Sequence, residues 1–166
     1  MSFYDLHLEL KVLDKRINDW NLGYKSKDAA GIDLFACIDE PIVMYPQAAP
    51  ILIGTGIAVH IKFPYAMALQ APRSSFGVKG LVLANTVGII DADYQGEIRM
   101  AAWNRNPIRF DLMNPIGDGI KISPGDRIAQ LIFMPILRAN FHVVEEFTAA
   151  TERGTGGLGS TGVAAG

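Results

Sequence analysis

The segment Gly88–Glu97, with the sequence GIIDADYQGE, contains three carboxylates close together, two of them between its glycines and the third directly after the second glycine. Asp91 and Asp93 are two residues apart, so in extended backbone they share a face. One of them could act as a general base, or both could hold a cation. The same composition is also typical of a turn, because aspartate and glycine are common turn residues. Spacing alone does not separate the catalytic interpretation from the structural one.

Polar residues that could bind a nucleotide precede this segment. Asn85 follows the apolar run 81–83, and its amide carries both the donor and the acceptor needed to read a pyrimidine edge. Arg73, Ser74 and Ser75 combine a cation, two hydroxyls and the amides of a helix start, which together could bind phosphate. Each also has a simpler interpretation: a turn asparagine, and an ordinary N-cap beside a solvated arginine.

The composition changes near the carboxyl terminus. From Thr148 onward the chain has six glycines in nineteen residues and few large apolar side chains, so this part cannot build a core. We therefore expect one domain over 1–147 and a flexible tail over 148–166. The segment Arg153–Gly162 resembles a loop that wraps phosphate, because glycines let backbone amides approach an anion. Because it lacks the ending of a P-loop and no strand leads into it, this segment taken alone is more typical of a disordered terminus.

Short apolar stretches between turn signals must position these groups. Several alternate with a period of two, as in Gly56–Lys62, and none holds a 3.6-residue period over three turns. One short helix is predicted after Arg73, where Ser74 and Ser75 could cap a turn that ends at Gly80. Strands at this spacing indicate a mainly β sandwich, jelly roll or barrel. The predicted strands cover 8–13, 32–37, 51–61, 67–71, 81–84, 98–103 and 129–135.

Length, charge and cysteine content narrow the class of protein. A chain of 166 residues with 49% hydrophobic residues can build one core without disulfides or metals. Its net charge of −2 is not the basic footprint that duplex nucleic acid requires, so we expect no nucleic-acid partner. No run of eighteen apolar residues occurs, and charges interrupt the amino terminus, so we expect neither a membrane span nor secretion. The single cysteine, Cys37, favours a reducing, cytoplasmic setting.

Read in order, the motif-bearing segments resemble the five motifs of the trimeric dUTPase family, and the resemblance spans roughly 11–162. It implies a jelly-roll-like (β-clip) fold with one short helix and a flexible glycine-rich tail. It also implies a homotrimer with active sites shared between subunits, and hydrolysis of dUTP to dUMP and pyrophosphate. The matching segments are Ala30–Leu34, Ala71–Ser75, Asn85–Glu97, Pro124–Leu131 and Arg153–Gly162.

The resemblance implies a role for individual residues. Asp91 would be the general base that activates the water attacking the α-phosphorus. Asn85 and the backbone of Gly88–Asp91 would select uracil, and Tyr94 would lie under the deoxyribose and exclude a 2′-hydroxyl. Mg²⁺ would be held through the substrate phosphates and water without a direct protein ligand, and Asp33 could contact it through water. The implied substrate-binding residues are Arg73, Ser74, Ser75, Asn85, Gly88, Ile89, Ile90, Tyr94, Arg99, Gln130, Arg153, Leu158, Gly159 and Ser160.

The chain departs from the family pattern at Leu158, where an aromatic residue usually stacks on the uracil, so that contact would be weaker. The main alternative function is that of dCTP deaminase, which resembles this chain in fold but uses a glutamate on the strand after its aspartate hairpin. Here the strand predicted at 98–103 holds no carboxylate, which argues against deamination. A regulatory trimer that senses dUTP is the other alternative. A bacterial cell and a phage-infected host are both compatible sources.

Overall fold

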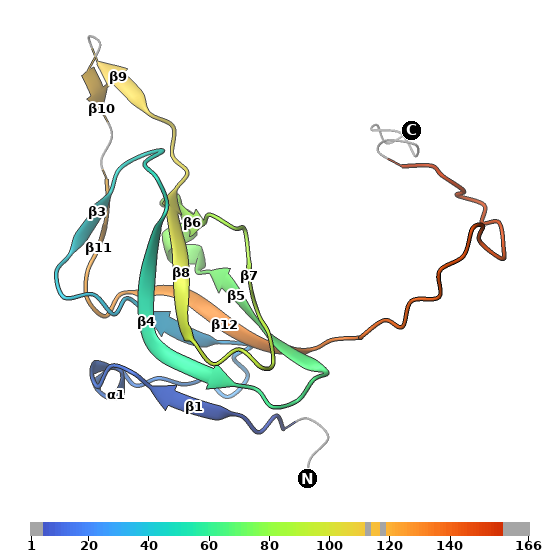
Figure 1. The fold of residues 1–166 in the computed structure, drawn as a ribbon. Coiled ribbons are helices and arrows are strands. Elements are labelled where there is room, and N and C mark those ends of the chain that lie inside the picture. Colours follow the sequence, from blue (N-terminus) through green and yellow to red (C-terminus); the bar gives the residue numbers. More distant parts are fainter. Residues whose placement is uncertain (1–4, 112–113, 117–118, 158–166) are drawn as a thin grey trace.

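The computed structural model describes residues 5–111, 114–116 and 119–157. Its body is built from antiparallel strands, which confirms the mainly β prediction (Figure 1). One four-stranded sheet has the order β1-β4-β8-β6. Its strands are β1 (Glu9–Val12), β4 (Ile51–His60), β8 (Glu97–Asn104) and β6 (Leu81–Leu83).

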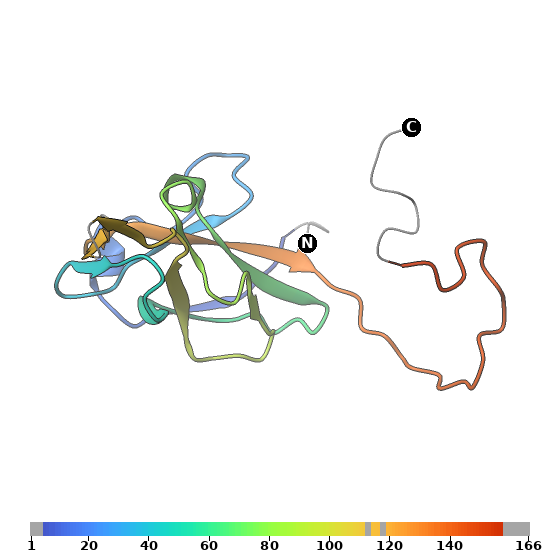
Figure 2. The ribbon, with the colours of Figure 1, turned by 90° about the horizontal axis from the view of Figure 1, so that it is seen from above.

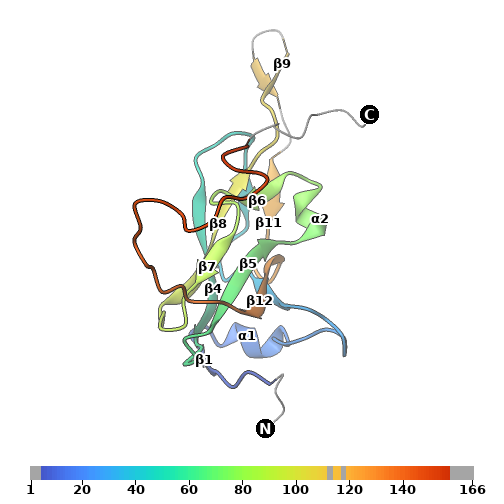
Figure 3. The ribbon, with the colours of Figure 1, turned by 90° about the vertical axis from the view of Figure 1, so that its right-hand side faces the viewer.

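The second four-stranded sheet has the order β2-β12-β5-β7. Its strands are β2 (Ile32–Phe35), β12 (Arg127–Pro135), β5 (Ala66–Pro72) and β7 (Gly88–Ile90). Two smaller antiparallel pairs complete the described strands: β3 (Ile42–Met44) with β11 (Ile120–Ile122), and β9 (Arg109–Asp111) with β10 (Asn114–Ile116). The β9–β10 pair projects from one end of the body (Figure 1 and Figure 3).

A single apolar core joins the two larger sheets. Along β8 the side chains alternate as a pleated strand requires, with Ile98, Met100 and Ala102 buried and their neighbours more exposed. Ile128 and Leu131 of β12 belong to the same buried cluster, although they come from the other sheet. Burial of these aliphatic side chains, at roughly 25 cal/mol per Å² of apolar surface, is the main favourable contribution to folding.

The structure contains the predicted helix after Arg73, but with a different start. Helix α2 (Ser74–Gly77) has Arg73 in the N-cap position with extended backbone, and no side chain caps it. The prediction that Ser74 and Ser75 cap this turn was therefore wrong. Gly80 follows the helix with a φ of +104°, a conformation that favours glycine.

A second short helix, α1 (Arg16–Asp19), was not predicted. It is too short for a helical period to be visible in the sequence. A local contact supports its start, because the Asp14 carboxylate accepts a hydrogen bond from the backbone N–H of Arg16 at 2.9 Å. Ile17 anchors the turn in the core. Among the described residues no helix is long and apolar enough to cross a membrane.

After β12 the chain leaves the body. Residues 136–157 form no strand or helix and extend away from both sheets (Figure 1 and Figure 2). Leu137, Phe141 and Phe147 of this segment are each more than nine-tenths exposed. Such large apolar side chains are costly to leave in water, so the segment is suited to contact another chain.

Candidate active site

One sheet places residues from separate sequence motifs on adjacent strands. Asp33 of β2 pairs in register with Gln130 of β12, and Gln130 pairs in turn with Ala71 of β5. The side-chain amide of Gln130 also donates a hydrogen bond to the carbonyl of Pro72 at 3.2 Å. The motifs that begin near residues 30, 71 and 124 therefore meet at one end of this sheet.

A buried carboxylate holds two arginines at this end of the sheet. Asp33 Oδ1 lies 3.2 Å from Nε of Arg73, and Oδ2 lies 3.3 Å from Nη1 of Arg127. The side chain of Asp33 is 10% exposed and that of Arg73 is 26% exposed. A guanidinium carries five N–H donors, so Arg73 keeps donors for an anionic ligand. Both oxygens of Asp33 face arginines, and its contact with Mg²⁺ through water stays a prediction.

Ser74 and Ser75 are brought close to Arg73 as the first residues of α2, and both are exposed. Gln130 joins the same neighbourhood through its hydrogen bond to Pro72, the residue before Arg73. Four of the residues predicted to bind phosphate thus come together within a single chain.

The second group of predicted residues surrounds β7. Asn85 lies in the exposed turn before this strand, and Asp91 follows its last residue and is also exposed. Tyr94 is 44% exposed, and its hydroxyl donates a hydrogen bond to the carbonyl of Glu97 at 3.0 Å. An open cleft runs beside this hairpin. It is lined by Leu52, Ile89, Ile90, Asp91, Tyr94, Gly96, Glu97, Ile98 and Arg99.

The structure does not bring Asp91 and Arg73 together within one chain. Strands β5 and β7 are antiparallel, and Ile90 pairs with Ala68, so Asp91 lies at the level of Met67, near the start of β5. Arg73 follows the opposite end of β5, six residues after Met67, which at about 3.3 Å per residue corresponds to about 20 Å. Figure 3 shows the same arrangement, with α2 at one end of β5 and the turn between β7 and β8 toward the other.

Glu97 is a residue of the cleft to which the sequence assigned no individual role. Its carboxylate accepts hydrogen bonds from the backbone N–H of Gly56 at 3.1 Å and from Nε of Arg99 at 3.0 Å. A Cβ on Gly54 would lie 2.6 Å from Glu97 Oε1, so the absence of a side chain there makes room for the carboxylate. This contact depends on the pairing of β4 with β8, which no local sequence signal reveals.

The predicted tail residues are separate from both groups. Arg153 is exposed, and its Nε donates a hydrogen bond to the carbonyl of Gly156 at 2.9 Å within the tail itself. Leu158, Gly159 and Ser160 lie outside the described residues. The tail therefore does not contribute Arg153 to the groups around Arg73 or Asp91 of its own chain.

Across the described part of the chain, no cluster of three or more histidine, cysteine, aspartate or glutamate side chains could hold a metal ion. A divalent cation bound near Arg73 or Asp91 would take most of its oxygen ligands from phosphate groups and water, an arrangement that Mg²⁺ favours.

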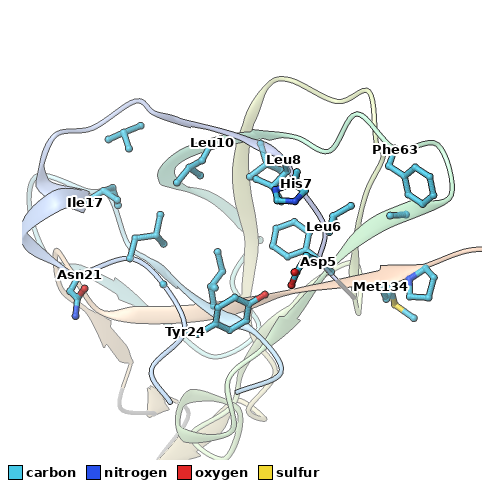
Figure 4. Close-up of a pocket in the computed structure, with 18 of the residues that line it drawn as sticks. Asp5, Leu6, His7, Leu8, Leu10, Ile17, Asn21, Tyr24, Phe63 and Met134 are labelled. Atoms are coloured by element: carbon cyan, nitrogen blue, oxygen red, sulfur yellow. The ribbon is translucent and has the colours of Figure 1, made fainter. Parts of the chain in front are cut away.

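A larger hollow lies elsewhere on the molecule. Figure 4 shows that it is lined mainly by apolar side chains, including Leu8, Leu10, Tyr24, Phe63 and Met134. These residues come from the amino-terminal segment and β1, the region after α1, the loop between β4 and β5, and β12. None of the residues predicted to act on or bind a nucleotide lines this hollow. We therefore place the candidate active site at the hairpin and at the end of the β2-β12-β5 sheet.

Comparison with known proteins assigns the family. A model of the dUTPase family matches residues 20–162. The chain belongs to the dUTPase family. It is 46% identical over 158 residues to a protein of Legionella pneumophila, covering 93% of this chain and 96% of that protein. A protein of Burkholderia ambifaria is 42% identical over 158 residues, covering 95% and 99%. Both relatives are named deoxyuridine 5'-triphosphate nucleotidohydrolase.

Solved structures of dUTPases share the fold. The Staphylococcus bacteriophage 80alpha dUTPase, determined with dUpNHpp, matches with a TM-score of 0.73 and 31% identity, over 95% of this chain and 99% of that one. A mutant dUTPase from phage phi11 of S. aureus, described with a structural Mg(II) ion, matches with a TM-score of 0.68 and 29% identity, over 86% and 99%. The predicted family and jelly-roll-like fold are thereby confirmed.

Proposed function

We propose that this dUTPase family member hydrolyses dUTP to dUMP and pyrophosphate, which would keep uracil out of DNA and supply dUMP. The observation that carries the proposal is the clustering on one sheet of the family's phosphate-binding motifs, around the Asp33–Arg73 ion pair. The same sheet ends in the hairpin that carries Asn85 and Asp91. The names of the relatives support the same activity.

Asp91 acts as the general base in this proposal. Its carboxylate is exposed at the mouth of the cleft, so a water molecule can reach it. The carboxylate orients that water and accepts its proton as the oxygen attacks the α-phosphorus, and pyrophosphate leaves. Such a base contributes typically about 10²- to 10⁴-fold to the rate.

The phosphates bind to Arg73, Ser74, Ser75 and Gln130, with Arg153 added by the tail. Arg73 is held by Asp33 with donors to spare, and the two serines offer hydroxyls at the start of α2. Mg²⁺ bound to the phosphates would neutralise part of the charge that develops as pyrophosphate leaves. The net charge of −2 makes this local compensation necessary, because the protein as a whole does not attract a polyanion.

Selection of the nucleoside rests on the hairpin around β7. The amide of Asn85 and the backbone of Gly88–Asp91 offer a fixed pattern of hydrogen-bond donors and acceptors that complements uracil. Cytosine presents the reverse pattern on its ring edge, so its polar groups would be left unpaired. Ile89, Ile90 and Arg99 line the adjoining cleft. The ring of Tyr94, fixed by the hydrogen bond to Glu97, packs under the deoxyribose and leaves no room for a 2′-hydroxyl.

The active enzyme is a homotrimer whose sites are shared between subunits. The separation of about 20 Å along β5 between the level of Asp91 and Arg73 supports a site in which two chains each contribute one group. The exposed apolar side chains of residues 136–157 support contact with another subunit. In this arrangement the domain 1–147 forms the body, and the tail 148–166 brings Arg153, Leu158, Gly159 and Ser160 to a neighbouring site.

We also propose a cytoplasmic location, in a bacterial cell or a phage-infected host. The bacterial relatives support this location. The single cysteine, which excludes an intrachain disulfide, is consistent with a reducing compartment.

One assay tests the activity directly. The protein is incubated with Mg²⁺ and with dUTP, dCTP, dTTP or UTP in turn, while pyrophosphate and ammonia are followed. We expect pyrophosphate from dUTP alone. Ammonia from dCTP would indicate a deaminase instead, and tight dUTP binding without turnover would indicate a sensor.

A further inference from the structure

Gln70 is a buried polar residue that the proposed mechanism does not use. It lies on β5 with its side chain directed inward, and it is 2% exposed. Within the described part of the chain, its Nε2 is a buried side-chain atom without a hydrogen-bond partner. Buried donors are nearly always paired in folded proteins, because an unpaired one loses its hydrogen bonds to water and gains nothing. An unpaired buried amide of this kind indicates a hydrogen-bond partner that a bound ligand supplies.

The position of Gln70 connects it to the nucleotide site. Gln70 pairs in register with Gly88, the first residue of β7. A Cβ on Gly88 would lie 2.7 Å from Oε1 of Gln70 and 2.9 Å from its Cβ, so the side chain of Gln70 fills the space that a side chain at 88 would occupy. The amide therefore lies directly against the backbone of β7, between Asn85 at one end of the strand and Asp91 at the other.

We propose that Gln70 is a specificity-determining residue whose free amide N–H donates a hydrogen bond to a carbonyl oxygen of the bound uracil. The proposal rests on the function proposed above, which assigns this hairpin to the base. Uracil carries two ring carbonyls, and the amide of Asn85 has to serve both a donor and an acceptor of the ring. The amide N–H of Gln70 is a second donor next to Gly88, and it matches the two carbonyl acceptors of the uracil ring. Binding of uracil would therefore give the unpaired amide a hydrogen-bond partner.

Gln70→Met tests the proposal because methionine has a similar length and shape but no donor. Loss of one neutral hydrogen bond should raise the KM for dUTP about 3- to 10-fold, with kcat nearly unchanged. The thermal midpoint should stay the same or rise, because the variant buries no unpaired amide. Gln95→Met is the matched control, since Gln95 is exposed on the same hairpin, and its KM should stay at the wild-type value.

A lower thermal midpoint of Gln70→Met with an unchanged KM would overturn the proposal. That result would mean that the amide stabilises the folded protein by a hydrogen bond to a buried water. If Gln70→Met does not fold, an experiment on the wild-type protein tests the proposal. With ¹⁵N-labelled glutamine, the side-chain amide signal of Gln70 should shift when a non-hydrolysable dUTP analogue is added and not when pyrophosphate is added. A Gln70 amide signal that shifts with neither the dUTP analogue nor pyrophosphate would also overturn the proposal. Wild-type protein that fails to hydrolyse dUTP would instead contradict the proposed function.

Discussion

The carboxylate of Asp33 lies 3.2 Å from Nε of Arg73, and this contact joins two motifs that are about forty residues apart in the sequence. The second oxygen of Asp33 faces Arg127 at 3.3 Å. One carboxylate between two guanidinium groups leaves a net charge of +1 on the cluster. The ion pair can therefore fix the orientation of Arg73 while the site still attracts a phosphate group.

Replacement of Asp33 by asparagine tests this role. Asp33→Asn keeps the size of the side chain but removes the charge that orients Arg73, so we expect the KM for dUTP to rise about tenfold, the loss that 1.4 kcal/mol of binding represents. Steady-state kinetics measures the effect. Asp28→Asn changes the net charge equally at an exposed position and should leave the KM unaltered. Equal KM values for the two variants would show that Arg73 does not depend on Asp33.

The separation of Asp91 from Arg73 along β5 leads to a complementation experiment. Asp91→Asn should abolish turnover while nucleotide binding stays measurable, and Arg73→Ala should lose most activity through weaker phosphate binding. If each site takes these two groups from different subunits, trimers refolded from an equal mixture should recover about a quarter of the wild-type activity, because random assembly leaves that share of sites intact.

Each variant refolded alone is the control for this experiment: Asp91→Asn should be inactive, and Arg73→Ala should keep only its small residual activity. A mixture that also stays inactive, although the subunits exchange, would mean that both groups act from the same chain. Near-normal turnover by Asp91→Asn alone would remove Asp91 from the mechanism altogether.

Much of the sheet structure could be predicted from the sequence, because the longer strands carry apolar runs or alternation. Each of the seven predicted strands corresponds to a strand, with ends shifted by a few residues, as β8 shows by starting at Glu97. Among the three-residue strands, β6 was predicted from its apolar run, whereas β3, β7, β9, β10 and β11 were missed because so short a run has no visible period. The start of α2 was misjudged because Ser74, a common cap residue, lies inside the helix instead.

Only the parts of the site that lie in short contiguous motifs could be predicted from the sequence. Arg73 and Asp91 stand in short segments whose composition suggests chemistry, and the resemblance to a family supplied their order. Gln70 and Glu97 were missed because their roles depend on strand register, which places Gln70 against Gly88. Sequence spacing also could not reveal that Asp91 and Arg73 lie at opposite ends of β5. The boundary predicted at residue 147 stays a prediction, and within the described residues the last strand ends earlier, at Pro135.

Tyr94 should control the discrimination between deoxyribose and ribose. Its hydroxyl is held by the carbonyl of Glu97, and Gly96 leaves space beside its ring, so the ring has a fixed position. Tyr94→Ala should therefore reduce the preference for dUTP over UTP, by up to about 100-fold in kcat/KM, the range over which a pocket rejects one added hydroxyl. Tyr94→Phe keeps the ring and should keep most of the preference. UTP turnover that stays at the wild-type level in Tyr94→Ala would assign the discrimination to another group.

Cys37 should be a slow nucleophile in the folded protein. Burial raises the pKa of this thiol to about 11, and the nearby carboxylate of Asp14 adds to the effect. The folded state therefore holds the thiol proton more tightly than the unfolded chain. This contribution to stability is fully present below the unfolded pKa of 9.0 and is lost as the pH rises through the folded value of about 11.

Alkylation by iodoacetamide measures this shift. At pH 8 the folded protein should react about 100-fold more slowly than the protein in urea, because a difference of two pKa units reduces the thiolate a hundredfold. The rate should then rise with pH to a midpoint near 11 in the folded protein and near 9 in urea. Restricted access to the half-buried sulfur would also slow the reaction, but it would leave the midpoint near 9. The position of the midpoint therefore separates a raised pKa from simple shielding.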